Sequence, residues 1–399
     1  MQGSFATRLT SLFCVLLAVC LWPAVCGHWL SLDWQVGDLR PALRCASGVL
    51  TLVGAVHLLR PRLLGAPLRR ALPDRRHAFF ALLSMIGALA LLGIALEVGL
   101  RLLGLPFRVE REASEYALAR FDPELGWAYR PDRTVTQRFG SEQRPVAMSF
   151  DTDGFRVATP ETRLDPGRPS LLLIGGSYAM GHGVSYEESL AGRLEATAGF
   201  PYQVVNLGVQ AYGTDQALLA LRRHIGRFDT RVVVYPFICD HMVRNQNADR
   251  RLLRPRSRFL GTKPRFTLGI DDRPVLTDLP RRYDDRFLSH LWAFLAVRFT
   301  GWGPVPSPAL TRALVQAMDR ESREHGARFV AIDWQVHAPR PYCGEHPLRG
   351  LGVPLIETSE DPTPGLASWT LPGDGHPNAR AHAHVAALLA QLLRNAGPP

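Results

Sequence analysis

The stretch Leu171-Leu-Leu-Ile-Gly-Gly-Ser-Tyr-Ala-Met-Gly181 decides how we expect this chain to fold. Its apolar run, bounded by glycines, predicts a buried strand, and Gly175-Gly176 allows a sharp turn that leaves Ser177 at the carboxyl end of that strand. In open α/β sheets, ligands and nucleophiles lie at this end of the strands. The stretch therefore predicts an α/β fold with Ser177 at its functional edge.

A second motif, near the other end of the chain, offers the groups that a serine nucleophile needs. A serine hydroxyl reacts poorly until a base takes its proton, and Asp374-Gly-His376-Pro-Asn378 offers His376 as that base. Asp374 can fix the tautomer of the imidazole. Gly-Gly-Ser alone is common in turns, and Asp-x-His alone is common in loops that cap helices. Their pairing within one strand and helix pattern indicates a serine hydrolase.

The chain around these motifs alternates between strand and helix patterns. Strands are expected over 171–174, 203–206, 231–237 and 328–334, and helices over 187–198, 215–227, 309–325 and from 378 onward. Such alternation implies a parallel sheet that helices cover on both faces. The last helix has apolar residues at helical spacing from Val385 to Leu393, and Asn378 is suited to cap it.

The first hundred residues differ in composition from the rest. Leu9–Leu30 and Cys45–Leu59 are largely apolar, and 78–96 is uncharged and long enough to cross a bilayer. We expect two to three transmembrane helices here, with the lipid bilayer as a partner. Two alternatives stay open: the first stretch can be a cleaved signal peptide, and the second a re-entrant or interfacial helix.

Charge predicts the orientation in the membrane. The loop between the second and third apolar stretches carries six arginines and one acidic residue, Asp74, and such loops lie in the cytoplasm. The chain after about residue 105 is then expected in the periplasm, as part of a multi-pass inner-membrane protein. The formal net charge is +10, but Lys263 is the only lysine and no basic run interleaves with aromatic residues. We therefore expect no nucleic-acid partner.

Three regions are expected along the chain. Residues 1–105 form the membrane region, and 106–168 form a connecting apron of short strands and turns. Residues 169–399 form the main domain. Within it, 245–308 is rich in Arg, Pro and Asp and is longer than a normal connection, which predicts an inserted lid or subdomain.

Cysteines and histidines give little sign of a metal site. Of the six cysteines, only Cys239 and Cys343 fall in the outer part of the chain, where a disulfide between them can form. His182, His382 and His384 have no metal-ligand spacing, because 382 and 384 point to different faces of one helix. We expect no metal ion and no organic cofactor.

Four blocks of the sequence resemble those of SGNH/GDSL-type hydrolases, in particular bacterial membrane-anchored members. The blocks are Gly175–Ser177, Val204–Gln216, Val232–Asp240 and Asp374–Asn378. Two further segments, Glu124–Trp127 and Asp153–Arg156, resemble the lead-in segments of those proteins. The resemblance covers roughly residues 120–395 and implies a flavodoxin-like fold with three layers and a parallel sheet.

The resemblance also implies roles for particular residues. Ser177 would be the nucleophile, His376 the base and Asp374 the group that orients it. The oxyanion hole of the family uses the N–H of the serine, a glycine N–H from the second block and an asparagine side chain from the third. Gly176 stands where the family often has aspartate.

This chain departs from the family on the oxyanion side. Gly208, in the second block, is expected in the oxyanion or binding region. The position of the donor glycine is taken by Ala211, which still offers an N–H. Cys239 takes the asparagine position, and a thiol is a weak donor. Asp240 and His241 follow and are also expected in the oxyanion or binding region, with His241 as the candidate replacement donor. A missing donor costs about 3–4 kcal/mol of transition-state stabilisation, so turnover would be weakened.

These residues favour a membrane-anchored serine esterase that acts outside the cytoplasm through an acyl-serine intermediate, on ester groups such as acyl decorations of envelope glycans. An O-acyltransferase with the same site is an alternative. Ala211 and Cys239 favour a second alternative, a weakly active or inactive module that binds glycan or protein. A third is an α/β-hydrolase fold, because Gly175–Ala179 nearly matches a nucleophile elbow. That fold would not place the serine after the first strand.

Overall fold

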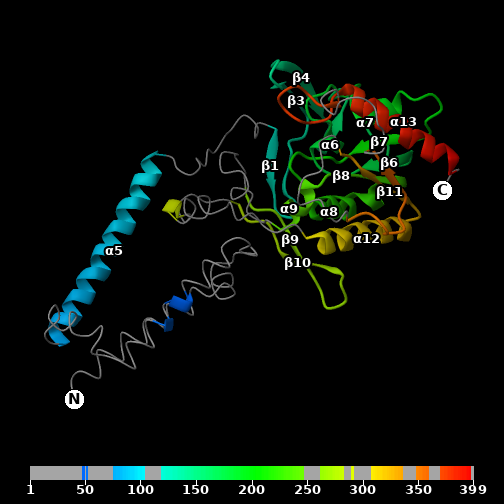
Figure 1. Ribbon diagram of the computed structural model, residues 1–399. Coiled ribbons are helices and arrows are strands. Elements are labelled where there is room, and N and C mark those ends of the chain that lie inside the picture. Colours follow the sequence, from blue (N-terminus) through cyan, green and yellow to red (C-terminus); the bar gives the residue numbers. More distant parts are fainter. Residues whose placement is uncertain are drawn as a thin grey trace. The chain divides into compact units, whose positions relative to one another are not determined.

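The computed structural model describes residues 47–49, 51–52, 75–103, 118–246, 261–282, 289–291, 307–335, 347–358 and 369–396. The chain forms two compact units (Figure 1). Unit 1 contains Met1–Arg108, Leu252–Arg256 and Asp285–Val305, and unit 2 contains Val109–Arg251, Ser257–Asp284 and Pro306–Pro399. The predicted insert over 245–308 is therefore divided between the two units.

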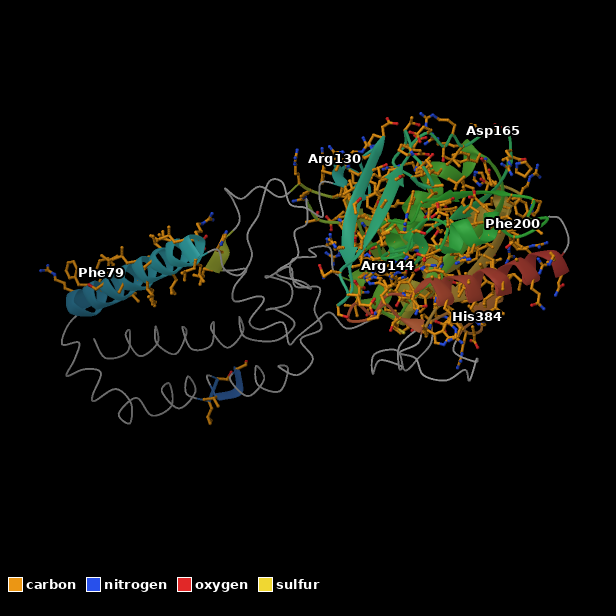
Figure 2. All side chains as sticks on the ribbon, turned by 90° about the horizontal axis from the view of Figure 1, so that it is seen from above. Phe79, Arg130, Arg144, Asp165, Phe200 and His384 are labelled. Carbon is orange, nitrogen blue, oxygen red and sulfur yellow. The ribbon has the colours of Figure 1, made fainter. Side chains whose placement is uncertain are left out.

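Unit 1 contains a long apolar helix, α5 (Arg75–Leu103). Its segment Leu82–Leu103 is, among the described residues, the helix long and apolar enough to cross a membrane. The large apolar side chains of this helix are exposed, and Figure 2 shows them, Phe79 included, projecting from it. A helix thus covers the predicted stretch 78–96, whereas Leu9–Leu30 and most of Cys45–Leu59 lie outside the described residues.

Within unit 1, Glu97 of α5 holds a segment of the predicted insert. Its carboxylate accepts hydrogen bonds from the Ser289 hydroxyl at 2.9 Å and from the N–H groups of His290 and Leu291 at 2.9 and 2.8 Å. Arg101, one turn further on, also donates to this carboxylate. Glu97 therefore gives the apolar helix a specific polar contact at residues 289–291.

Unit 2 is built on a five-stranded parallel sheet. Its strands are β6 (Pro169–Leu173), β7 (Gln203–Asn206), β8 (Asp229–Phe237), β11 (Arg328–Asp333) and β12 (Leu355–Glu357). They lie in the order β12-β11-β8-β6-β7, and every pair is parallel. Counted along the chain this is 2-1-3-4-5, the flavodoxin-like doubly wound order. β6 is the first strand of the sheet, so the α/β-hydrolase interpretation is wrong.

Helices cover both faces of the sheet, as predicted. Leu171 and Leu173 of β6 point into one core with α7 (Leu190–Glu195) and α13 (Ala379–Asn395). Leu172, between them, points into the other core with α8 (Thr214–His224) and α12 (Pro308–Glu324). Figure 1 shows these two helix layers on opposite sides of the sheet. Both faces of β6 are therefore buried, which explains why its apolar run is continuous.

Several element boundaries differ from the prediction. The helix expected over 187–198 is shorter because the hydroxyl of Ser189 caps its start by accepting from Gly192 N–H. The helix expected over 215–227 ends at His224 and continues as one 3₁₀ turn, η2 (Ile225–Arg227). The short β12 was missed because three residues carry no readable periodicity. Asn378 caps α13 as predicted, accepting from Arg380 and Ala381 N–H.

The segment preceding β6 forms antiparallel strands. They are β1 (Ala119–Asp122), β2 (Gly126–Tyr129), β3 (Arg133–Phe139), β4 (Arg144–Phe150) and β5 (Arg156–Val157). Their side chains do more than connect, since Trp127 and Phe150 are buried in the core that contains α8. Trp127 Nε1–H also donates to Gln210 O at 3.0 Å, within the second block. These strands therefore support the site loops directly.

Within the described residues, the part of the insert that belongs to unit 2 contains a hairpin, β9 (Arg265–Leu268) and β10 (Pro274–Asp278), beside α9 (Asp240–Gln246) and α12. Lys263 anchors it: its buried ammonium contacts the carboxylate of Asp215, which is also fully buried, and donates to Pro264 O at 2.8 Å. Asp215 lies in the first turn of α8. The chain's single lysine thus ties the hairpin to the helix that follows the second block.

Candidate active site

Ser177 lies where β6 turns into a short helix, α6 (Ser177–Met180). The turn needs glycine, because Gly175 has a φ of +140° and an added Cβ would lie 3.3 Å from the Cβ of Ala179. Ser177 is the first helical residue, so its N–H has no acceptor within the helix. The serine sits at the switch point between β6 and β8, where doubly wound sheets bind ligands.

The structure brings the three predicted residues together. Ser177 Oγ lies 2.9 Å from His376 Nε2, and His376 Nδ1 contacts Asp374 Oδ1. Asp374 and His376 stand on the loop before α13, where Leu371 N–H donates to His376 O at 2.8 Å and Asp374 N–H donates to Leu371 O at 3.1 Å. This is the geometry of a nucleophile, a base and the group that orients the base.

The electrostatics of the pair suit a base. Burial lowers the pKa of His376 to about 4, so its imidazole is neutral at pH 7. Hydrogen bonds from His182 and His376 hold the pKa of Asp374 far below its usual range. Asp374 is therefore a carboxylate under all ordinary conditions, and His376 is free to accept a proton from Ser177.

Three groups that can bind metals, His182, Asp374 and His376, have ligand atoms within 4.8 Å of one another. The two imidazole rings, however, lie 3.9 Å apart with 32° between their planes. Rings stacked in this way cannot aim two nitrogen lone pairs at one ion. His382 lies elsewhere, where its Nδ1 accepts from Leu190 N–H at 3.0 Å. The arrangement fits a hydrogen-bonded cluster better than a metal site.

Ala211 has an unusual backbone conformation for its residue type. Its φ of +66° is in the left-handed region, which glycine adopts freely and alanine only at a cost of about 1 kcal/mol. This explains why a glycine suits the position in the family. The N–H of Ala211 donates no hydrogen bond within the described part of the chain. It therefore keeps the capacity to donate to a bound oxyanion.

Gly208 is not placed as an oxyanion donor. Its N–H donates to the side-chain oxygen of Asn206 at 3.0 Å. An added Cβ would lie 2.4 Å from Met180 N, so the glycine allows the second block to approach α6 closely. The predicted binding role of Gly208 is therefore replaced by a packing role.

Cys239 cannot act as the weak thiol donor that the sequence suggested. It is disulfide-bonded and so has no S–H. Every other cysteine, Cys343 included, lies outside the described residues. Asp240 begins α9 and has its Oδ2 4.0 Å from Arg244 Nη2. The third block therefore offers no side-chain donor at the asparagine position.

His241 and Arg244 cover the outer face of the serine turn. His241 is buried, its Nδ1 lies 2.7 Å from the Tyr235 hydroxyl, and its Nε2 lies 3.1 Å from where a Cβ on Gly176 would stand. Arg244 Nη1 lies 3.3 Å from the same point and donates to Tyr212 O at 3.0 Å. Sequence reasoning missed Arg244, although its spacing from Asp240 on one helix was a signal.

Arg156 was also missed as a site residue. Its buried guanidinium donates to Met180 O and Val184 O, both at 2.6 Å, and to Gly181 O. These carbonyls follow the serine helix, so Arg156 holds the loop behind Ser177. The signal was the lead-in segment Asp153–Arg156, whose role the sequence alone did not show.

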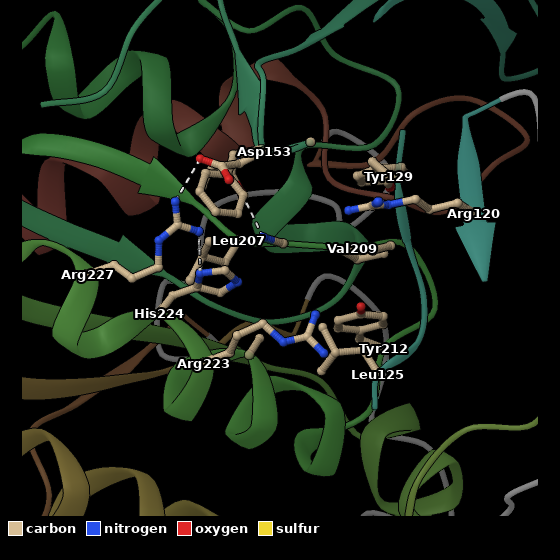
Figure 3. A pocket seen from close by; sticks show the side chains of 16 residues that line it. Arg120, Leu125, Tyr129, Asp153, Leu207, Val209, Tyr212, Arg223, His224 and Arg227 are labelled. Atoms are coloured by element: carbon tan, nitrogen blue, oxygen red, sulfur yellow. Dashed lines mark hydrogen bonds and ion pairs between the residues drawn. The ribbon is translucent and has the colours of Figure 1, made fainter. Parts of the chain in front are cut away.

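A separate cavity of about 210 Å³ lies beyond the second block, between Gly208, the β1–β2 hairpin and α8 (Figure 3). Ser177 does not line it. Two of its arginines are neutralised, since Arg223 pairs with Asp122 and Glu124 and Arg227 pairs with Asp153. Figure 3 shows these arginines around the cavity. This balance of charge gives the cavity no clear ligand class.

A doubly wound parallel sheet with a serine after its first strand, and an Asp-x-His pair before its last helix, is the arrangement that the resemblance to SGNH/GDSL-type hydrolases implied. Fold and site thus agree with the resemblance of the four sequence blocks.

Comparisons with known proteins give only distant similarities. A scan against protein-family models and a search of curated proteins find no match. Among solved structures, the chain is similar to TesA, with 14% identity and a TM-score of 0.35 over 57% of this chain and 98% of that one. It is also similar to a GDSL-like lipase from Bacteroides thetaiotaomicron VPI-5482, with 10% identity and a TM-score of 0.33 over 58% of this chain and 89% of that one. A third similar structure is AlinE4, an SGNH-hydrolase family esterase, with 14% identity and a TM-score of 0.30 over 59% of this chain and 100% of that one.

Proposed function

We propose that this chain is a membrane-anchored serine hydrolase that cleaves ester bonds through an acyl-serine intermediate. The observation that carries the proposal is the contact series from Ser177 Oγ to His376 and from His376 to Asp374. Ser177 Oγ attacks the ester carbonyl while its proton passes to His376 Nε2. The same proton then leaves with the alcohol, and water repeats the sequence on the acyl-serine.

The oxyanion is held by backbone groups in this proposal. The N–H of Ser177 at the start of α6 and the N–H of Ala211 are the donors. With Cys239 disulfide-bonded, the third donor of the family is missing, so slow turnover is expected.

The proposed location is the outer side of a bacterial inner membrane. It is supported by the apolar helix Leu82–Leu103, by the arginine-rich loop before it and by the disulfide at Cys239, since disulfides persist in oxidising compartments. An ester-bearing envelope glycan is the substrate class that this location favours.

Fluorophosphonate labelling of the full chain in detergent tests the proposal. We expect the native chain to be labelled and the Ser177→Ala variant to remain unlabelled, because the probe reacts with an activated serine. His384→Phe serves as a control, since His384 lies on α13 and its ring packs against that of Trp369. A well-folded native chain that takes no label would reject the hydrolase.

Two observations favour a second candidate, a weakly active or inactive module that binds glycan or protein. They are the strained Ala211 and the loss of a donor at Cys239. Glycan binding that is unchanged in Ser177→Ala, together with absent labelling, would support this candidate. An O-acyltransferase differs from the hydrolase only in the acceptor, so acyl transfer to an added sugar alcohol in competition with water separates the two.

A further inference from the structure

A second histidine contacts the carboxylate that orients the base. His182 is 7% exposed, and its Nε2 lies 3.3 Å from Asp374 Oδ2. Its ring stacks on that of His376 with 3.9 Å between centroids, and the ring of Phe139 packs edge-on against its other side at 4.6 Å. Asp374 therefore has one oxygen on each imidazole.

A backbone hydrogen bond and close packing hold His182 in place. Its N–H donates to Ser177 O at 3.0 Å, and its neighbour Gly181 has a φ of +80° that ends α6. On the other side, Gly183 leaves room for Leu371 of the Asp374 loop, because an added Cβ would lie 2.2 Å from Leu371 Cδ1. The His182 loop and the Asp374 loop therefore interlock.

The hydrogen-bond pattern fixes the tautomer of His182. Asp374 is a carboxylate, so the 3.3 Å contact requires the proton on Nε2 of His182. The other nitrogen, Nδ1, is buried and has no hydrogen-bond partner within the described residues.

We propose that His182 is a positioning residue for the Asp374–His376 pair. By donating to Asp374 Oδ2, it stops rotation of the carboxylate and keeps Oδ1 directed at His376. Its stacked ring fixes the tilt of the His376 imidazole toward Ser177. The expected effect on kcat rests on the proposed function, whereas the contacts of His182 do not depend on it.

Two substitutions separate the donor from the ring. His182→Phe keeps a stacked ring and removes the hydrogen-bond donor. His182→Gln removes the ring and keeps a side-chain N–H that can reach Asp374 as Nε2–H does. If the hydrogen bond positions the carboxylate, kcat falls by about 10- to 100-fold in the Phe variant, the loss expected for a hydrogen bond to a charged group, with KM unchanged. The Gln variant should regain most of that loss. His384→Phe again controls for a histidine-to-phenylalanine exchange elsewhere.

A second measurement does not depend on turnover. The proton between His376 Nδ1 and Asp374 gives a far-downfield proton resonance when the pair is held tightly. We expect this resonance in the native chain and in His182→Gln, and its loss by exchange in His182→Phe. If the native chain is inactive but the resonance follows this pattern, the proposed function fails and the positioning role stands. A Phe variant with native kcat, or with an unchanged resonance, overturns the role of His182.

Discussion

The two sides of Ser177 differ in how completely they are built. On the base side, His376 and Asp374 are in contact and His182 adds a further partner to Asp374. On the oxyanion side, Ala211 replaces a glycine and Cys239 is disulfide-bonded where the family has an asparagine.

The difference separates two requirements of acyl transfer. Proton transfer needs a neutral base in contact with the serine, and this chain meets that condition in full. Stabilisation of the oxyanion needs donors aimed at the developing charge, and among the described residues the donors that we propose are the backbone N–H groups of Ser177 and Ala211. We therefore expect a reactive serine that labels readily but turns over slowly, because acylation by an activated probe depends less on the oxyanion hole than ester cleavage does.

The largest effect is expected on the base side. His376→Ala removes the base, and fluorophosphonate labelling should slow by at least about 10⁴-fold, as in sites where the members of a triad act as one unit. The measurement is the second-order labelling rate at pH 7. If His376→Ala still labels at the native rate, the base side is not the source of serine reactivity.

Loss of the lysine anchor should destabilise the unit that carries the oxyanion side. Lys263→Ala leaves the charge of Asp215 buried without its cation at the start of α8, which costs about 3–5 kcal/mol of folding stability. Chemical denaturation of the detergent-solubilised chain measures it. The control is the double variant Lys263→Met with Asp215→Leu, which removes both charges and should recover much of the loss. Equal midpoints for Lys263→Ala and the native chain would contradict the role of the anchor.

Acid should lower the stability of the fold through three buried histidines. Burial lowers the pKa of His376 and His224 to about 4 and that of His382 to about 3, against about 6.5 in an unfolded chain. Between these values the unfolded chain binds more protons than the folded one, so stability is complete above pH 6.5 and falls as the pH drops toward 4.

Thermal unfolding from pH 7 to pH 4 tests this slope, and labelling over the same range should keep its rate until the pH approaches the His376 pKa of about 4. His382→Leu should flatten part of the stability slope, since it removes one buried histidine whose Nδ1 accepts from Leu190 N–H. A stability that does not change between pH 7 and pH 4 would show that these histidines are not buried in neutral form.

The smallest effect is expected from Ala211→Gly, which restores the glycine of the family. Relief of the left-handed φ should stabilise the chain by about 1 kcal/mol and leave the donor N–H in place. Ala217→Gly, in the buried part of α8, is the matched control and should destabilise by about 1 kcal/mol. If both exchanges destabilise equally, Ala211 is not strained.

The sequence allowed the sheet to be predicted because β6, β7, β8 and β11 carry apolar residues between clear boundaries. Ser177 could be predicted because it follows β6, and Asp374 and His376 because they precede the clearly patterned helix α13. Gly208 and Cys239 were assigned incorrectly because the assignments depended on where an N–H points and on the oxidation state of a thiol, which sequence does not show.

Other contacts arise only from tertiary structure. Arg156 contacts the loop after Ser177, and His182 contacts the loop that carries Asp374. Each contact joins segments that are separate in sequence and meet only in the folded chain. The pairing of Lys263 with Asp215 joins residues on different elements, and no local pattern announces it.

The buried lysine gives the molecule a natural chemical reporter. Lys263 carries the only side-chain amine in the sequence, and that amine is enclosed in the folded state. Amine-directed reagents should therefore leave folded unit 2 unmodified. Acylation of Lys263 should occur only when the β9–β10 hairpin detaches from α8. The rate of that single modification would report how often this unit opens, with no engineered tag and no change to the site.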